Sequence, residues 1–190
     1  MDIFTAIILG VAQGFTEFLP VSSSGHLVLL QRVFGISEPA LFFDTMLHVG
    51  TLAAVVAALW RDIGAILGRL IQPLTAYLII ATLPAVVFAL AFKDMIEAAF
   101  VSGEFLGFAF LITSVLLTVS ELLARRAKSG GKKAGDGPVK PMNWLDALII
   151  GALQAAAIIP GVSRSGATLS GALFRGLDRD FGARFSFLLS

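Results

Sequence analysis

Two short polar stretches interrupt an otherwise apolar sequence, and both carry side chains suited to phosphate chemistry. The second stretch, Pro160 to Thr168, reads Pro-Gly-Val-Ser-Arg-Ser-Gly-Ala-Thr. Its arginine presents a planar fork of donors that matches phosphate oxygens. Hydroxyl groups and the free N–H groups at a helix start add further donors. We therefore expect a phosphate-binding loop, in which Arg164 is assisted by Ser163, Ser165, Gly166 and Thr168.

The first polar stretch offers acid–base groups instead. Glu17 follows Gln13 by four residues, so both lie on one helix face. Their oxygens suit a hard cation, Mg²⁺ or Ca²⁺, and Glu17 could also serve as a base. His26 can transfer protons near neutral pH or act as a nucleophile. We expect Glu17, His26 and Ser23 to be catalytic and Ser22, Ser24 and Gly25 to bind phosphate, while the nucleophile stays open between a serine, His26 and water.

Structural roles are the alternative for the same residues. Serine and glycine often serve only to pack membrane helices closely. Arg164 could anchor a helix end at the membrane interface, and His26 could be a structural hydrogen-bond donor. Asp44 and His48 are also four residues apart. The two residues either line the cavity near the site or pair with each other as a buried polar couple; we favour the couple and leave both out of the catalytic set.

An internal repeat relates the two polar stretches. A shift of 141 positions, without a gap, pairs Gln13 with Gln154 and aligns Val-Ser-x-Ser-Gly of the first stretch with the same pattern in the second. The copies differ where chemistry would be expected, because Ser23 pairs with Arg164 and His26 with Ala167. One copy would thus supply the acid–base groups and the other the cationic clamp of a single phosphoryl-transfer site.

The composition is that of a helical membrane protein. The 190 residues are 57% hydrophobic and 14% charged, and the mean hydropathy is +0.89. Soluble domains usually carry about a quarter charged residues. The net charge of +1 gives no support for nucleic-acid binding, and the absence of cysteine excludes disulfides and thiolate chemistry.

The apolar runs predict spans over residues 40–60, 75–92, with a kink at Pro84, and 105–123. Residues 124–141 read as a flexible basic linker, which the positive-inside rule places in the cytoplasm. We expect loops at 61–74 on the inner side and 93–104 on the outer side. Residues 1–34 and 142–175 would each dip into the membrane and return, although a single crossing of either segment remains an alternative.

The expected fold is therefore an all-α polytopic membrane protein with an inverted-topology repeat. Two re-entrant broken-helix pairs would meet near the bilayer midplane, as in known inverted-repeat folds. Residues 1–123 would form the first repeat, 124–141 the linker, and 142–190 the start of a second repeat. By symmetry, a complete second repeat would extend to roughly residue 270.

Three motifs in this order resemble the signatures of the bacterial undecaprenyl pyrophosphate phosphatases, also called bacitracin resistance proteins. They are Gln13-Gly-Phe-Thr-Glu17, Pro20-Val-Ser-Ser-Ser-Gly-His26 and Pro160-Gly-Val-Ser-Arg-Ser-Gly-Ala-Thr168. The family pattern has Glu or Gln at the first position, and Gln13 takes the variant that weakens a two-carboxylate metal site. The resemblance implies catalytic roles for Glu17, His26 and Arg164, with Ser23, Ser163, Ser165 and Thr168 holding phosphate.

The resemblance also implies a function. The protein would hydrolyse undecaprenyl pyrophosphate to undecaprenyl phosphate and inorganic phosphate, recycling the carrier lipid for peptidoglycan synthesis. It would depend on a metal, lie in the bacterial plasma membrane, and open its active site toward the outer face. Expected partners are the polyprenyl pyrophosphate lipid and the bilayer, with a homodimer left open. The alternative is a transporter or flippase of an anionic lipid or solute on the same inverted repeat.

Overall fold

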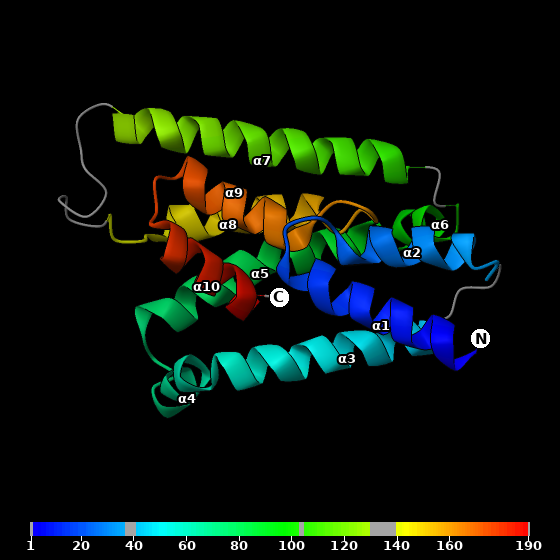
Figure 1. Ribbon diagram of the computed structural model, residues 1–190. Coiled ribbons are helices and arrows are strands. Elements are labelled where there is room, and N and C mark those ends of the chain that lie inside the picture. Colours follow the sequence, from blue (N-terminus) through cyan, green and yellow to red (C-terminus); the bar gives the residue numbers. More distant parts are fainter. Residues whose placement is uncertain (1, 37–40, 103–104, 130–139, 190) are drawn as a thin grey trace.

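A computed structural model describes residues 2–36, 41–102, 105–129 and 140–189. In these ranges the regular structure is entirely helical (Figure 1). The helices are α1 (Ile3–Phe18), α2 (Ser23–Val33), α3 (Leu41–Ala58), α4 (Trp60–Gly68), α5 (Pro73–Ala91), α6 (Lys93–Ser102), α7 (Leu106–Ser129), α8 (Trp144–Ala156), α9 (Arg164–Phe174) and α10 (Arg179–Leu189).

Helices long and apolar enough to cross a membrane occur where the sequence predicts spans. Pro73–Ala91 and Leu106–Arg126 have mean hydropathies of 2.2 and 2.0. Phe42–Ala58 and Trp60–Gly68 pass the same test together, with a bend of 77° between them. The outward faces of α5 and α7 are apolar, as bilayer contact requires. The prediction of an all-α polytopic membrane protein is confirmed.

Two expected connections are themselves helical, and there the sequence-based prediction is wrong. The inner loop at 61–74 contains α4, and the outer loop at 93–104 contains α6. Both helices are short and carry charges near their starts, which suits helices lying at a membrane surface. Helix α7 also continues into the expected linker as far as Ser129. The rest of the basic linker, 130–139, lies outside the described residues.

Helix α5 is a single helix through Pro84. Proline removes one backbone donor, but such losses are tolerated in membrane helices that pack against others. That packing is close here, because a Cβ on Gly151 of α8 would lie 2.3 Å from the carbonyl oxygen of Ala81 in α5. Helices α5, α8, α9 and α10 share one buried apolar cluster. Its residues are Ala81, Ala147, Ile150, Ala172, Leu177 and Phe185.

Two helical hairpins, α1–α2 and α8–α9, enter the bundle from opposite ends, and their turns meet in the middle (Figure 1). A Cβ on Gly25 would lie 3.2 Å from the Cα of Gly161, so the turns are in contact. A Cβ on Gly166 would lie 3.3 Å from the carbonyl oxygen of Pro20. The two broken-helix pairs are thus present, whereas the repeat symmetry and the domain boundaries based on it stay predictions.

The α8–α9 hairpin returns to the end from which it entered. Lys140, just before α8, donates to the carbonyl oxygen of Arg175, just after α9, over 3.0 Å. The carboxylate of Asp146, which has no exposed surface, accepts from Lys140 Nζ at 2.8 Å and from Arg175 Nε at 2.6 Å. Oδ2 of the same carboxylate caps α8 by accepting from the Asn143 N–H. These contacts hold the two ends of residues 142–175 together, as the predicted hairpin requires, while its depth in the membrane stays a prediction.

Candidate active site

A cavity of about 700 Å³ lies where the two hairpin turns meet α3 and α5. One part of its wall is polar and comes mainly from the turns and from one face of α3. The rest is apolar and comes from α3, α5, α10 and the chain before α9. The polar lining is Thr16, Glu17, Ser22, Ser23, Ser24, Thr45, His48, Thr51, Gln154, Ser163, Arg164 and Ser165. The apolar lining is Phe18, Val49, Leu52, Val55, Ala85, Val86, Ala89, Ala157, Ile158, Ile159, Val162 and Phe187.

Glu17, in the last turn of α1, is the centre of the first polar cluster. Its Oε2 accepts a 2.5 Å hydrogen bond from Ser23 Oγ at the start of α2. The same oxygen accepts from Gln13 Nε2 at 3.0 Å. A carboxylate that accepts the proton of a serine hydroxyl is the arrangement of a general base with its nucleophile. Glu17 and Ser23 therefore form a pair able to start covalent catalysis.

The backbone before Ser23 is strained. Ser22 has φ +67°, a left-handed conformation that L-residues with side chains seldom adopt. Its side chain caps α2 by accepting from the Gly25 N–H. Such conformations cost of the order of 1–3 kcal/mol and cluster at functional sites. Ser22, Ser23 and Ser24 form the cavity wall at this turn, so the start of α2 borders the cavity.

The second hairpin contributes the cationic wall. Ser163 caps α9, accepting from the Gly166 N–H at 3.1 Å, and its Oγ lies 3.3 Å from Ser165 Oγ. Its own N–H donates to Thr113 Oγ1 of α7, which fixes the turn. Arg164, the first residue of α9, lines the cavity. Two helix N-termini and a guanidinium group thus border one cavity, an arrangement that favours anions.

Seven of the twelve residues predicted for the site line this cavity, and five do not. The seven are Glu17, Ser22, Ser23, Ser24, Ser163, Arg164 and Ser165. Gly25 and Gly166 lie behind the lining and allow the turns to approach. Thr168 Oγ1 donates to the carbonyl oxygen of Arg164 and lies 2.5 Å from Ser186 Oγ of α10.

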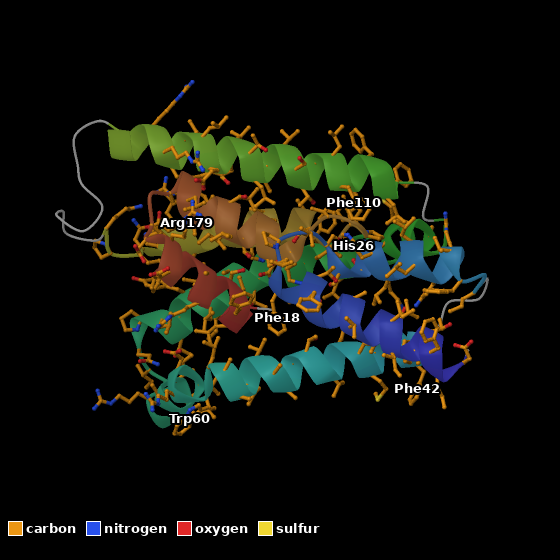
Figure 2. The ribbon with its side chains drawn as sticks, in the orientation of Figure 1. Phe18, His26, Phe42, Trp60, Phe110 and Arg179 are labelled. Atoms are coloured by element: carbon orange, nitrogen blue, oxygen red, sulfur yellow. The ribbon has the colours of Figure 1, made fainter. Side chains whose placement is uncertain are left out.

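His26 is the most consequential of the residues outside the lining. Its Nδ1 lies 2.7 Å from the carbonyl oxygen of Ser22, to which it donates. Its ring faces Phe110 of α7, with 5.2 Å between the ring centroids. Figure 2 labels both residues, on α2 and on the neighbouring α7. A catalytic role for His26 stays a prediction, and the contacts seen here are those of a residue that supports the turn.

The predicted metal pair does not fit an ion in this cavity. Gln13 is buried outside the lining and turns its amide nitrogen, not its oxygen, toward Glu17. The described residues include no group of three or more His, Cys, Asp or Glu that could hold a metal. Mg²⁺ bound by a single carboxylate relies on substrate oxygens and water for its other ligands. The divalent cation therefore stays a prediction, and the described part of the chain offers no ligand cage for it.

His48 lines the cavity, which is the less favoured of the two alternatives that the sequence offered for it. It projects from α3 into the cavity, and its Nε2 lies 3.9 Å from Glu17 Oε2. The expected couple with Asp44 is wrong, because the Asp44 carboxylate accepts from Gln31 Nε2 at 2.7 Å. His48 Nδ1 uses only the Asp44 backbone carbonyl, at 2.8 Å. The spacing of Asp44 and His48 was the available signal, but nothing in it indicates that α3 packs beside α1.

Chemically, the cavity can bind an amphiphilic anion and attack it. The helix starts and Arg164 suit phosphate oxygens, and the serine–carboxylate pair can supply a nucleophile. The apolar wall of α3 and α5 suits a hydrocarbon chain next to the phosphate. This combination fits phosphoryl transfer from a lipid phosphate ester or anhydride.

Comparisons with known proteins agree with this chemistry. The family model described as "Bacitracin resistance protein BacA" matches residues 6–190. The chain is 47% identical over all 190 residues to the undecaprenyl-diphosphatase of Carboxydothermus hydrogenoformans and covers 69% of that protein. It is 46% identical over its full length to undecaprenyl-diphosphatase 4 of Bacillus thuringiensis subsp. konkukian, covering 70% of it. It is 43% identical to the undecaprenyl-diphosphatase of Chlorobaculum parvum, covering 71% of it. The chain belongs to the bacitracin resistance protein family, BacA.

Proposed function

We propose that this protein hydrolyses undecaprenyl pyrophosphate to undecaprenyl phosphate and inorganic phosphate, regenerating a carrier lipid for peptidoglycan synthesis. The observation that carries the proposal is the Ser23–Glu17 hydrogen bond inside a cavity shared with Arg164. The names of the relatives, undecaprenyl-diphosphatases, support the same substrate. The mixed lining supports it too, because this lipid combines a pyrophosphate with a long hydrocarbon chain.

Substrate binding divides between the two walls. Arg164 and the N–H groups at the starts of α2 and α9 would hold the pyrophosphate oxygens, with Ser163 and Ser165 as further donors. The first isoprene units would lie along Val49, Leu52 and Val55 of α3 and Val86 and Ala89 of α5. Burial of these units contributes roughly 25 cal/mol for each Å² of apolar surface.

Covalent catalysis by Ser23 follows from its hydrogen bond. As Ser23 Oγ forms a bond to the terminal phosphorus, its proton passes to Glu17 Oε2, 2.5 Å away. The bond between that phosphorus and the bridging oxygen breaks, and undecaprenyl phosphate leaves with the bridging oxygen. Arg164 offsets the negative charge on the transferring group, as arginine does in other phosphoryl transfers. The product of this half-reaction is phosphoserine at position 23, with Glu17 protonated.

The site is proposed to lie in the bacterial plasma membrane and to open toward its outer face. Arg125 and Arg126, near the end of α7, and Lys140, just before α8, lie at the end of the bundle where α8 begins, which supports a cytoplasmic location for that end. The chain contains no cysteine, so single cysteines can be introduced and labelled with a membrane-impermeant maleimide. Labelling from outside at Glu104 and not at Lys140 is the expected pattern. A homodimer stays a prediction.

Phosphate release from undecaprenyl pyrophosphate by the purified protein tests the function. Ser23→Ala, Glu17→Gln and Arg164→Ala should each lower kcat by at least about 100-fold, the range for removal of a catalytic group. Wild-type activity in all three variants would refute the proposed site. The transporter alternative predicts substrate counterflow in liposomes without phosphate release, and that result would replace the proposed function.

A further inference from the structure

Hydrolysis of the phosphoserine needs a second proton acceptor in the cavity. This step rests on the proposed function, in which Glu17 takes the serine proton in the first half-reaction. Glu17 is then protonated and suited to return that proton to Ser23 Oγ as the phosphorus–oxygen bond breaks. It cannot at the same moment accept a proton from the attacking water. Some other group near the phosphoserine must hold that water and take its proton.

His48 has the geometry for this role. Its Nδ1 donates to the Asp44 carbonyl oxygen over 2.8 Å, which places the hydrogen of the neutral ring on Nδ1. The lone pair of Nε2 is thereby turned toward the cavity, 3.9 Å from Glu17 Oε2. That distance is too long for a direct hydrogen bond, and a water hydrogen-bonded to both atoms fits it. The His48 side chain lines the cavity and is 39% exposed, which leaves room for a water molecule beside it.

His26, the histidine that the sequence motif draws attention to, does not meet these conditions. Its Nδ1 is held by the Ser22 carbonyl oxygen and its ring lies against Phe110, behind the cavity lining. Gln154 lines the cavity from the other hairpin but cannot accept a proton near neutral pH. Asp44 is committed to Gln31.

We propose that His48 is a catalytic residue of the second half-reaction, where its Nε2 accepts a hydrogen bond from the hydrolytic water and aims it at phosphoserine 23. The water oxygen forms a bond to phosphorus while one water proton passes to His48 Nε2. The bond between phosphorus and Ser23 Oγ breaks, and Glu17 returns its proton to that oxygen. Inorganic phosphate leaves, and His48 releases its proton to bulk water. The free serine and the ionised Glu17 are restored.

Rapid-mixing kinetics with undecaprenyl pyrophosphate distinguish the two half-reactions. His48→Leu, which cannot accept a hydrogen bond, should release undecaprenyl phosphate in a burst of up to one equivalent. Its release of inorganic phosphate should be slowed about 100-fold or more, the usual contribution of general acid–base catalysis. His48→Gln keeps an acceptor oxygen but takes no proton, so its steady-state rate should fall between those of wild type and His48→Leu. Mass spectrometry should find phosphate on Ser23 in the His48→Leu protein.

The outcomes separate this inference from the proposed function. Equal turnover in wild type and His48→Leu would overturn the role of His48 and leave the phosphatase assignment intact. A folded His48→Leu protein that loses both product phases together, with no phosphoserine, would also overturn it. Leu52→Ala, on the same face of α3 but in the apolar wall, is the matched control. It should raise KM without producing a burst, and thermal unfolding of each variant checks that it is folded.

Discussion

Separating the two hairpin turns should lower phosphatase activity even when every polar side chain of the site is intact. The variant Gly25→Ala tests this. The added methyl group would lie 2.8 Å from two ring atoms of Phe110 and 3.2 Å from the Cα of Gly161. Carbon atoms pack best at about 3.5–4.0 Å. The Phe110 ring can move aside, but Gly161 offers only backbone, so the turns must separate by roughly 0.3–0.8 Å.

The expected energies work in opposite directions. Overpacking of this kind usually costs about 1–3 kcal/mol, whereas replacing glycine by alanine within a helix returns up to about 1 kcal/mol. The net loss of stability should therefore be about 0–2 kcal/mol, and the protein should still fold. Activity is more sensitive, because a misplacement of about 1 Å can cost 100-fold in rate. We expect kcat for phosphate release to fall by roughly 10-fold or more.

Phosphate release and thermal unfolding, measured together, check this prediction. Gly14→Ala is the matched control, because a Cβ at Gly14 in α1 meets no atom within 4 Å. It should keep wild-type kcat. The double variant Gly25→Ala with Phe110→Leu removes the ring contact but not the contact with Gly161, so it should recover only part of the activity. Wild-type kcat in Gly25→Ala would refute the idea that the turns must touch, and full recovery in the double variant would assign the effect to the ring.

Three further predictions concern the charged groups and the cation. Asp146→Asn leaves Lys140 and Arg175 without their shared carboxylate, and denaturant unfolding should show that the free energy of unfolding falls by about 2 kcal/mol. The loss is smaller than for a fully buried pair because both cations keep some contact with water, and an unchanged unfolding midpoint would contradict the prediction. Arg164→Lys keeps the charge but loses the planar fork, so kcat/KM should fall about 10- to 100-fold, and parity with wild type would argue against two-point contact with phosphate. Chelation should reduce phosphate release, and added Mg²⁺ should restore it. Because Gln13 and Glu17 offer no cage, we expect Mg²⁺ to bind together with the lipid pyrophosphate and not to the protein alone, and tight binding of Mg²⁺ to the protein alone, measured by calorimetry, would contradict this.

The sequence predicts the large features of the fold because they depend on composition along the chain. The spans that became α3, α5 and α7 are long apolar runs, and bilayer thickness sets their length. The two turns are marked by Pro20 and by the Pro160-Gly161 pair, which end helices. Gly161 has φ +90°, a conformation that glycine adopts without strain. The helix-ending residues in the sequence were therefore sufficient to locate the turns of both hairpins.

Side-chain direction is what the sequence could not supply. Gln13, His26 and Thr168 belong to the motifs, but none of them lines the cavity. His26 packs against Phe110 and Thr168 contacts Ser186, partners that only the fold brings near them, whereas Gln13 donates to Glu17 on its own helix. His48 was left out of the catalytic set for the opposite reason, since its position beside Glu17 depends on α3 lying beside α1. Helices α4 and α6 were missed because their charges were interpreted as loop signals.

The meeting of the two turns also has a consequence for synthesis of the protein. Gly25 and Gly161 touch in the folded chain but lie far apart along it. A ribosome that has completed the first hairpin has therefore made Glu17 and Ser23 without the wall that carries Arg164. Nascent chains should stay inactive until α8 and α9 enter the membrane. Because domains fold from the N-terminus during synthesis, insertion of the second hairpin is the step that joins the wall carrying Arg164 to the acid–base pair made earlier.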